Sequence, residues 1–190
     1  MAGQFVYKKV LVLGATSGIG KALASKFVNN DIKVVVTGRR KENLDQFVQE
    51  HGKDKAEAIQ FDITQLDKIP SFAKSVMESH PDIDCVFVNS GIQRHFNFAK
   101  PETIDLNTFD EEFKTNYTSY IHLTTAILPY LQKQQNQTAL MYTSSGLALV
   151  PIPRYPNYCA TKAALHVSLI SAASPNRKLI HEMLSLTFFA

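Results

Sequence analysis

Five short apolar runs divide the chain at regular intervals, and longer stretches with helical spacing of apolar residues separate them. A short, fully apolar run is typical of a strand that is covered on both faces. The runs are residues 10–13, 33–37, 56–61, 84–88 and 139–142, and the helical stretches are 21–30, 41–49, 66–80 and 109–132. This alternation predicts βαβ units with right-handed crossovers, and therefore an α/β fold built on one parallel sheet. Residues 93–107 show no periodicity and are predicted to form a surface loop.

Length and composition agree with one globular domain. The chain has 190 residues, of which 45% are hydrophobic and 19% charged, and its net charge of +3 comes from scattered Lys and Arg. This excludes a disordered chain and gives no nucleic-acid-binding surface. No apolar run approaches the ~18 residues of a membrane span, and the first residues contain no signal-peptide core. We therefore expect a cytoplasmic protein with neither membrane nor nucleic acid as a partner.

The cysteines and histidines give no sign of a disulfide or a metal site. Cys85 and Cys159 form no C-x-x-C pair and are expected to be free thiols. The histidines also lack metal-ligand spacing, so no metal is expected; those considered are His95, His122, His166 and His181.

A glycine-rich turn follows the first run and precedes a helical stretch. It reads Gly14-Ala-Thr16-Ser17-Gly18-Ile19-Gly20. Glycines here let the backbone approach a phosphate closely, and the helix N-terminus directs free N–H groups at it. A Walker P-loop needs glycine where Ala15 stands and Ser or Thr where Ala22 stands, so an ATPase is excluded. The remaining alternative is a tight turn without a ligand.

Two arginines follow the second run. In dinucleotide-binding folds an acidic residue at this place selects NAD, whereas an arginine accommodates the additional phosphate of NADP. The chain has Arg39 and Arg40 and no acid there. We predict that Arg39 contacts the 2′-phosphate, with Arg40 as its neighbour and substitute. Alternatively, both are solvated loop charges.

Polar residues and a glycine also follow the third and fourth runs. Asp62 and Ile63 come after the third run, and Asn89, Ser90 and Gly91 after the fourth. A glycine directly after a strand keeps the backbone accessible to a flat ligand. These five residues are therefore candidates for contacts with a cofactor.

The fifth run leads to a possible proton-transfer group. Tyr158 and Lys162 are four residues apart at the start of an Ala-rich helical segment, so both side chains lie on one helix face. A nearby cation favours the phenolate and is expected to lower the pKa of Tyr158. The Ser145 hydroxyl, just after the fifth run, could hold a carbonyl or alcohol oxygen. Alternatively, the Tyr-x-x-x-Lys pattern is a chance match on a solvated helix face.

One group of candidates follows each of the five predicted strands: Gly14–Gly20, Arg39, Asp62, Asn89 and Ser145. Because ligands of parallel α/β sheets bind beyond the carboxyl ends of the strands, one site at this edge is expected to contain them. Asn116 is a further candidate, in the middle of the 109–132 helix. Asparagine is a poor helix former, which indicates a local reason for its presence; the alternative is an exposed helix residue.

Between residues 8 and 168 the chain resembles the classical short-chain dehydrogenase/reductase family. The glycine turn is similar to the family's T-G-x-x-x-G-I-G loop, with Leu13 in place of the commonest threonine. Residues 89–91 resemble its N-A-G motif with Ser90 for alanine. The catalytic tetrad of the family matches Asn116, Ser145, Tyr158 and Lys162. The resemblance implies a Rossmann-type doubly wound parallel sheet with strand order 3-2-1-4-5.

The resemblance also implies roles for these residues. Asp62, with Ile63 beside it, would contact adenine, and residues 89–91 would border the adenosine ribose. Ser145 would polarise the substrate oxygen, and Tyr158 would donate or accept its proton. Lys162 would bind the nicotinamide ribose and lower the pKa of Tyr158, while Asn116 would hold a water in a proton relay.

The chain departs from the family after Ser168. Residues 171–177 are expected to break the helix early, and the family's Pro-Gly turn, lid and last strands are missing or replaced. We expect an NADP-binding domain over residues 1–174 and an atypical tail over 175–190. Residues 183–189 could add an edge strand or simply cover apolar surface.

The leading functional hypothesis is an NADP(H)-dependent oxidoreductase that interconverts a carbonyl and a secondary alcohol. We expect this protein to be a homo-oligomer. The alternatives are a catalytically weak, dimer-forming nucleotide-binding protein and, more distantly, a sugar-nucleotide epimerase.

Overall fold

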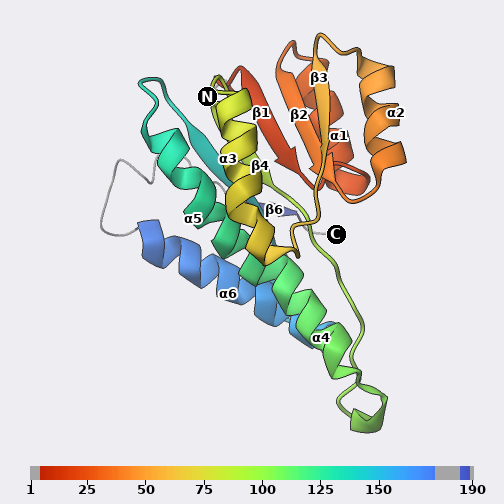
Figure 1. Cartoon of the computed structure of the whole chain (residues 1–190). Coiled ribbons are helices and arrows are strands. Elements are labelled where there is room, and N and C mark those ends of the chain that lie inside the picture. Colours follow the sequence, from red (N-terminus) through yellow and green to blue (C-terminus); the bar gives the residue numbers. More distant parts are fainter. Residues whose placement is uncertain (1–4, 174–184, 189–190) are drawn as a thin grey trace.

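The computed structural model describes residues 5–173 and 185–188, which form a sheet with helices on both faces (Figure 1). The sheet has six parallel strands in the order β3-β2-β1-β4-β5-β6, so the predicted order 3-2-1-4-5 is confirmed and β6 extends it. The strands are β1 (Lys9–Leu13), β2 (Lys33–Gly38), β3 (Ala56–Gln60), β4 (Cys85–Val88), β5 (Ala139–Ser145) and β6 (Ser185–Phe188). The helices are α1 (Gly18–Val28), α2 (Lys41–His51), α3 (Ile69–Ser79), α4 (Leu106–Phe113), α5 (Ser119–Gln132) and α6 (Pro156–Ala173).

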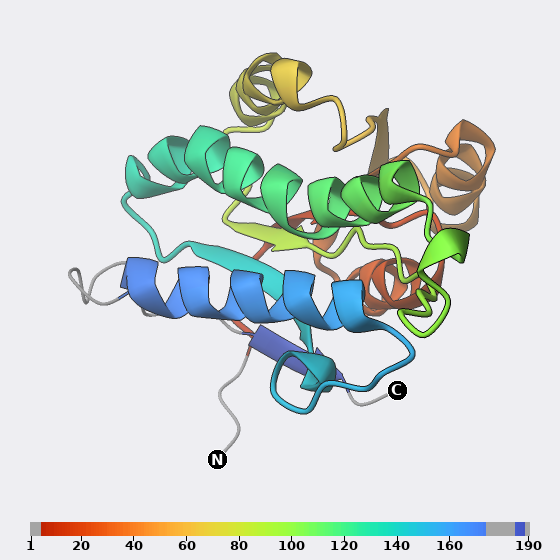
Figure 2. The ribbon, with the colours of Figure 1, turned by 90° about the horizontal axis from the view of Figure 1, so that it is seen from below.

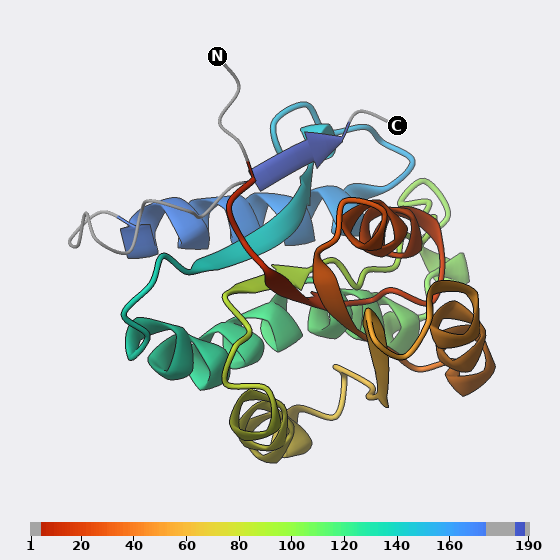
Figure 3. The same cartoon turned by 90° about the horizontal axis from the view of Figure 1, so that it is seen from above.

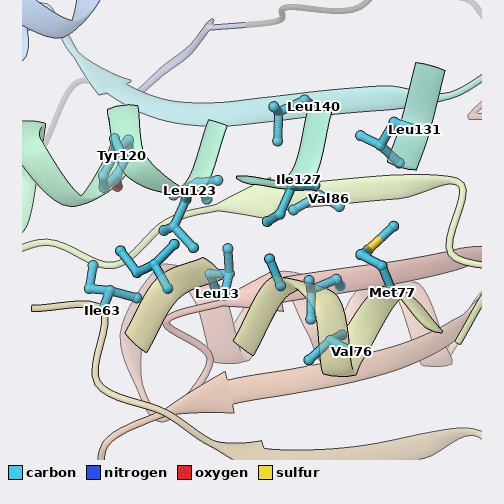
Figure 4. Close-up of a cluster of buried hydrophobic side chains, with 14 of the residues drawn as sticks. Leu13, Ile63, Val76, Met77, Val86, Tyr120, Leu123, Ile127, Leu131 and Leu140 are labelled. Atoms are coloured by element: carbon cyan, nitrogen blue, oxygen red, sulfur yellow. The ribbon is translucent and has the colours of Figure 1, made fainter. Parts of the chain in front are cut away.

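The fully apolar strands are covered on both faces. In β1, Leu11 and Leu13 pack with α3, α5 and α6, whereas Val10 and Val12 pack with α1 and α2 on the opposite face. Figure 2 shows α3, α5 and α6 following one another across the sheet, and Figure 4 shows part of the cluster that they enclose. Burial of these side chains is the main favourable contribution to folding.

The register of the strands brings their carboxyl ends to one edge. Leu13 at the end of β1 is the partner of Thr37 on β2 and of Val88 on β4. Val88 is in turn the partner of Tyr142 on β5. The residues that follow these positions therefore begin side by side, as the sequence predicts.

The predicted 109–132 helix is not continuous, which corrects that prediction. It consists of α4, a π-helical turn (Lys114–Thr118) and α5. A π turn inserts one extra residue per turn and is frequent at functional sites. Here it contains Asn116, whose side chain bonds outside the helix. Helix α4 also starts within the predicted loop, at Leu106, because Asp105 caps it by accepting a hydrogen bond from Asn107 N.

The tail contributes a strand to the sheet. Residues 185–188 form β6, which pairs in parallel with residues 142–145 of β5 (Figure 3). Of the two possibilities for residues 183–189, the added edge strand is the one observed for the described part, Ser185–Phe188. Most of the predicted helix break at residues 171–177 lies outside the described residues, and α6 continues to Ala173.

Three smaller expectations concern helix starts, thiols and the membrane. The predicted 66–80 helix begins as a 3₁₀ turn (Leu66–Lys68) before α3. Cys85 and Cys159 are both buried free thiols, as predicted. None of the helices in the described part is long and apolar enough to cross a membrane.

Candidate active site

One pocket of about 600 Å³ lies at the carboxyl edge of the sheet. It brings together most of the predicted site residues, which come from the ends of β1 to β4 and from α6. From the predicted set, the lining contains Gly14, Thr16, Ser17, Gly18, Ile19, Arg39, Arg40, Asp62, Ile63, Asn89, Ser90, Gly91, Tyr158 and Lys162. This volume is within the range of small-molecule and cofactor sites.

The glycine turn is held by the neighbouring strand. The backbone N–H groups of Gly14 and Ala15 both donate to the carbonyl oxygen of Thr37, at 3.0 and 2.9 Å. The turn then enters α1, whose N-cap residue Ser17 makes no side-chain capping bond. The first N–H groups of α1 therefore remain available to a ligand.

Two glycines in this turn make room that a side chain would fill. Gly14 has a φ of +92°, and a Cβ there would lie 2.6 Å from the backbone nitrogen of Ser90. A Cβ on Gly20 would clash with the carbonyl oxygen of Gly14. Gly20 is therefore needed for the packing of the turn, although it does not line the pocket. The turn thus has the close-packed glycine geometry that a dinucleotide phosphate requires.

The two arginines have different surroundings. Arg40 is already engaged, since its Nη2 donates to the hydroxyls of Thr16 and Ser17, both at 2.6 Å. The guanidinium of Arg39 makes no hydrogen bond or ion pair within the described residues, and only its carbonyl oxygen accepts, from Gln60. Arg39 therefore presents a free cation to the pocket, whereas Arg40 supports the glycine turn.

The residues after β3 and β4 have defined partners. Asp62 Oδ1 accepts from the Thr64 backbone N–H at 2.9 Å and from its hydroxyl at 2.8 Å, which fixes the carboxylate at the pocket wall. Asn89 Nδ2 donates to the Gly14 carbonyl at 3.2 Å, and Thr143 donates from its hydroxyl to Asn89 Oδ1 at 2.8 Å. These contacts tie β4 and β5 to the glycine turn.

Tyr158 and Lys162 lie on the first turns of α6, on the face directed at the pocket. Lys162 is 2% exposed, its Nζ donates to the Thr143 carbonyl at 2.8 Å, and it lies 5.7 Å from the centroid of the Tyr158 ring. Ser145 at the end of β5 is hydrogen-bonded to Tyr158. Serine, tyrosine and lysine therefore converge, as predicted: Tyr158 and Lys162 line the pocket, and Ser145 contacts Tyr158 without lining it.

The expected lowering of the Tyr158 pKa by Lys162 is wrong for this structure. Burial raises the pKa of Tyr158 above its ordinary value, and the negative charge of Glu112 acts in the same direction. The hydrogen bond with Ser145 opposes both effects. Burial also lowers the pKa of Lys162 to about 8. Desolvation of the charged forms thus outweighs the attraction that the spacing of the two residues suggests.

Asn116 is fully buried, so its alternative interpretation as an exposed helix residue is wrong. Its Oδ1 accepts from the Ile92 backbone N–H at 2.9 Å, and its Nδ2 donates to the Ile92 carbonyl at 2.8 Å. Nδ2 also lies 3.3 Å from the Thr161 hydroxyl. The side chain clamps the segment after β4 against α6, and it does not line the pocket.

Some lining residues were missed by sequence reasoning. Each lies within two positions of a predicted site residue, and that adjacency was the available signal; they are Gly38, Phe61, Thr64, Ile92, Gln93, Thr115 and Thr143. Thr143 is the clearest omission, since it contacts both Asn89 and Lys162.

A parallel Rossmann-type sheet, a glycine turn at a helix N-terminus and a Ser, Tyr and Lys group at one edge define the class of dinucleotide-dependent dehydrogenases. A family model described as short chain dehydrogenase matches residues 8–176. The chain therefore belongs to the short-chain dehydrogenase family.

Individual relatives agree with this assignment. The uncharacterized oxidoreductase DltE of Bacillus subtilis is 32% identical over 161 residues, which cover 83% of this chain and 61% of DltE. The 3-oxoacyl-[acyl-carrier-protein] reductase FabG of Thermotoga maritima is 29% identical over 160 residues, which cover 83% of this chain and 63% of FabG. A short-chain dehydrogenase structure from Streptomyces avermitilis superimposes with a TM-score of 0.80 at 28% identity, covering 97% of this chain and 65% of that one. The chain thus spans less than two thirds of each of these proteins.

Proposed function

We propose that this protein is an NADP(H)-dependent oxidoreductase that interconverts a carbonyl and a secondary alcohol. The observation that carries the proposal is the meeting, in one pocket, of the glycine turn, the free guanidinium of Arg39 and the pair Tyr158 and Lys162. The first two fit a phosphorylated dinucleotide, and the pair fits a group that moves a proton.

Different residues of the chain would contact different parts of NADP(H). The N–H groups at the start of α1 would hold the pyrophosphate, and Arg39 would pair with the 2′-phosphate. Asp62 and the segment Asn89–Gly91 would border the adenosine. NADP(H) supplies or accepts the hydride when it is bound.

Ser145, Tyr158 and Lys162 would carry out the proton transfer to the substrate oxygen. The Ser145 hydroxyl would hold the substrate oxygen, and the Tyr158 phenol would give its proton to that oxygen as the carbonyl is reduced. A raised pKa keeps Tyr158 protonated at neutral pH. The protonated phenol is the form that a proton donor requires. The ammonium of Lys162, on the same helix face, supports the negative charge that remains on Tyr158.

Two experiments on the purified chain test the proposal together. Fluorescence titration with NADPH and NADH should show tighter binding of NADPH, and a panel of aldehydes and ketones should contain a substrate whose addition consumes NADPH. We expect NADPH to bind measurably, because the residues proposed to contact the adenosine half follow β1 to β4 and line the pocket. Binding of NADPH without any turnover would favour the alternative of a nucleotide-binding protein, and no binding would refute both.

Two further expectations remain predictions. The exposed apolar side chains Leu149, Val150 and Ile152 follow β5 beside the site and are suited to contact with a substrate or a second subunit. A homo-oligomer is therefore still expected, with sedimentation velocity as the test. The cytoplasmic location is likewise a prediction.

A further inference from the structure

The ammonium of Lys162 is buried without a carboxylate partner. Its side chain is 2% exposed, and no ion pair to it occurs within the described residues. In the part of the chain that the structure describes, its one side-chain hydrogen bond is to the Thr143 carbonyl. A buried cation with a single neutral acceptor is poorly compensated, so another contact is needed to keep it charged.

The face of an aromatic ring provides that contact. Lys162 Nζ lies over the ring of Tyr120 on α5, 5.3 Å from its centroid, and 5.7 Å from that of Tyr158. Tyr120 is itself completely buried, at one end of the cluster in Figure 4. Both distances are within the range of cation–π attraction, which strengthens when the pair is desolvated.

The hydroxyl of Tyr120 reaches the cofactor side of the site. It donates to the Ser90 carbonyl oxygen at 2.7 Å. Ser90 packs against Gly14 of the glycine turn and lines the pocket. One side chain therefore contacts both the catalytic lysine, through its ring, and the turn after β4, through its hydroxyl.

We propose that Tyr120 is a positioning residue for the reaction: its ring stabilises the charged form of Lys162, and its hydroxyl fixes the Ser90 carbonyl beside the cofactor. The expected effect of Tyr120 on carbonyl reduction rests on the proposed function. The two contacts themselves can be tested without turnover.

Few groups face the Lys162 ammonium, so a change in its pKa can be assigned to one of them. Among residues 5–173 and 185–188 they are Tyr158 on its own helix, Tyr120 on α5 and the neutral Thr143 carbonyl on β5. Glu112 acts on Tyr158 and is not paired with Lys162. Burial lowers the pKa of Lys162 to about 8, so a modest loss of support changes its charge near neutral pH.

The test compares phenylalanine with pentafluorophenylalanine at position 120. Both remove the hydroxyl and keep a ring of similar shape, but fluorination removes the negative face of the ring and hence the attraction for a cation. The pKa of Lys162 is measured by NMR of isotope-labelled lysine, its signal being assigned by its loss in Lys162→Met. Pentafluorophenylalanine at Tyr142 is the matched control, since Tyr142 is equally buried and stacks on Tyr120.

With phenylalanine we expect the pKa of Lys162 to stay near its wild-type value and NADPH to bind roughly fivefold more weakly, from loss of one hydrogen bond. With the fluorinated ring we expect the Lys162 pKa to fall by about one. The rate of carbonyl reduction should then fall more at about pH 8 than at about pH 6, because a smaller fraction of Lys162 is charged.

Equal Lys162 pKa values in the two variants would overturn the role of the ring. An equal fall in the Tyr142 control would do the same, since general packing would then explain it. Unchanged NADPH affinity in Tyr120→Phe would overturn the role of the hydroxyl. If the Lys162 pKa responds as expected but no carbonyl is ever reduced, the proposed function fails while the contact stands.

Discussion

Lys162 Nζ on α6 donates a hydrogen bond to the main-chain carbonyl of Thr143 on β5, at 2.8 Å. The same threonine donates from its hydroxyl to Asn89 Oδ1, and Asn89 donates to the Gly14 carbonyl. A continuous chain of hydrogen bonds therefore joins the lysine of the proton-transfer group to the glycine turn. The two halves of the candidate site are held in one fixed relationship, which hydride transfer requires.

Cofactor preference should depend on Arg39 and not on Arg40. Arg39→Ala removes a free guanidinium from the pocket wall, so we expect NADPH affinity to fall roughly tenfold to a hundredfold while NADH affinity is unchanged. Arg40→Ala removes support from Thr16 and Ser17, so it should weaken both cofactors alike. Fluorescence titration of both variants with both cofactors makes the comparison. An unchanged NADPH preference in Arg39→Ala would assign the phosphate contact elsewhere.

Glu112 should make stability depend on pH. It is fully buried, its Oε1 accepts from the Arg94 backbone N–H at 2.8 Å, and its Oε2 has no partner within the described residues. Burial raises the pKa of Glu112 above the ordinary 4.5, so the folded state binds its proton more tightly than the unfolded chain. Stability is therefore lost as pH rises from about 4.5 through the folded pKa.

Glu112→Gln removes this titration. We expect the variant to have a higher Tm than the wild type at about pH 8 and a smaller advantage at about pH 5. The pKa of Tyr158 should also fall, because the negative charge of Glu112 raises it. Glu111→Gln is the control, since Glu111 is partly exposed and pairs with Arg94. A Tm difference that does not vary with pH would show that Glu112 is not the titrating group.

Asn116 should act mainly on stability and on the shape of the site. Asn116→Ala leaves the Ile92 N–H and carbonyl without their partners, which should cost about 2–4 kcal/mol of unfolding free energy. Urea unfolding measures this, with Asn136→Ala at an exposed position as the control. Loss of activity with unchanged stability would instead favour the water-holding role that the family resemblance implies.

Strand β6 should protect the edge of β5. Deleting residues 174–190 removes the backbone partner of residues 142–145 and leaves a bare strand edge beside Ser145. We expect a lower Tm and concentration-dependent self-association in sedimentation velocity, whereas a chain ending at Phe188 should behave like the parent. A stable, monomeric deletion variant would mean that β6 contributes little.

The fold and most of the site could be predicted because they depend on local patterns. The run Val10–Leu13, followed by a glycine turn and a helix, determines a strand and its phosphate loop without long-range information. The convergence of Arg39, Asp62 and Asn89 followed from the rule that parallel strands end at one edge.

What could not be predicted depends on burial and on tertiary contacts. The π turn at Asn116 exists together with bonds to Ile92, which is 24 residues away. The direction of the Tyr158 pKa reverses because desolvation, which spacing does not reveal, is the largest effect. Thr143 was missed because a threonine within a strand carries no motif, although its two hydrogen bonds join Asn89 and Lys162.

Transfer of deuteride to a carbonyl substrate from NADPH that carries deuterium at both C4 positions tests the central proposal most directly. For a substrate found in the panel, we predict that mass spectrometry detects deuterium on the alcohol carbon with the wild type. With Tyr158→Phe the label should appear roughly 100-fold to 10,000-fold more slowly, because the proton donor is lost while the cofactor still binds. Tyr155→Phe, three residues earlier, is the matched control and should transfer label like the wild type. Label transfer by Tyr158→Phe at the wild-type rate, or an alcohol product without deuterium, would contradict hydride transfer at this site.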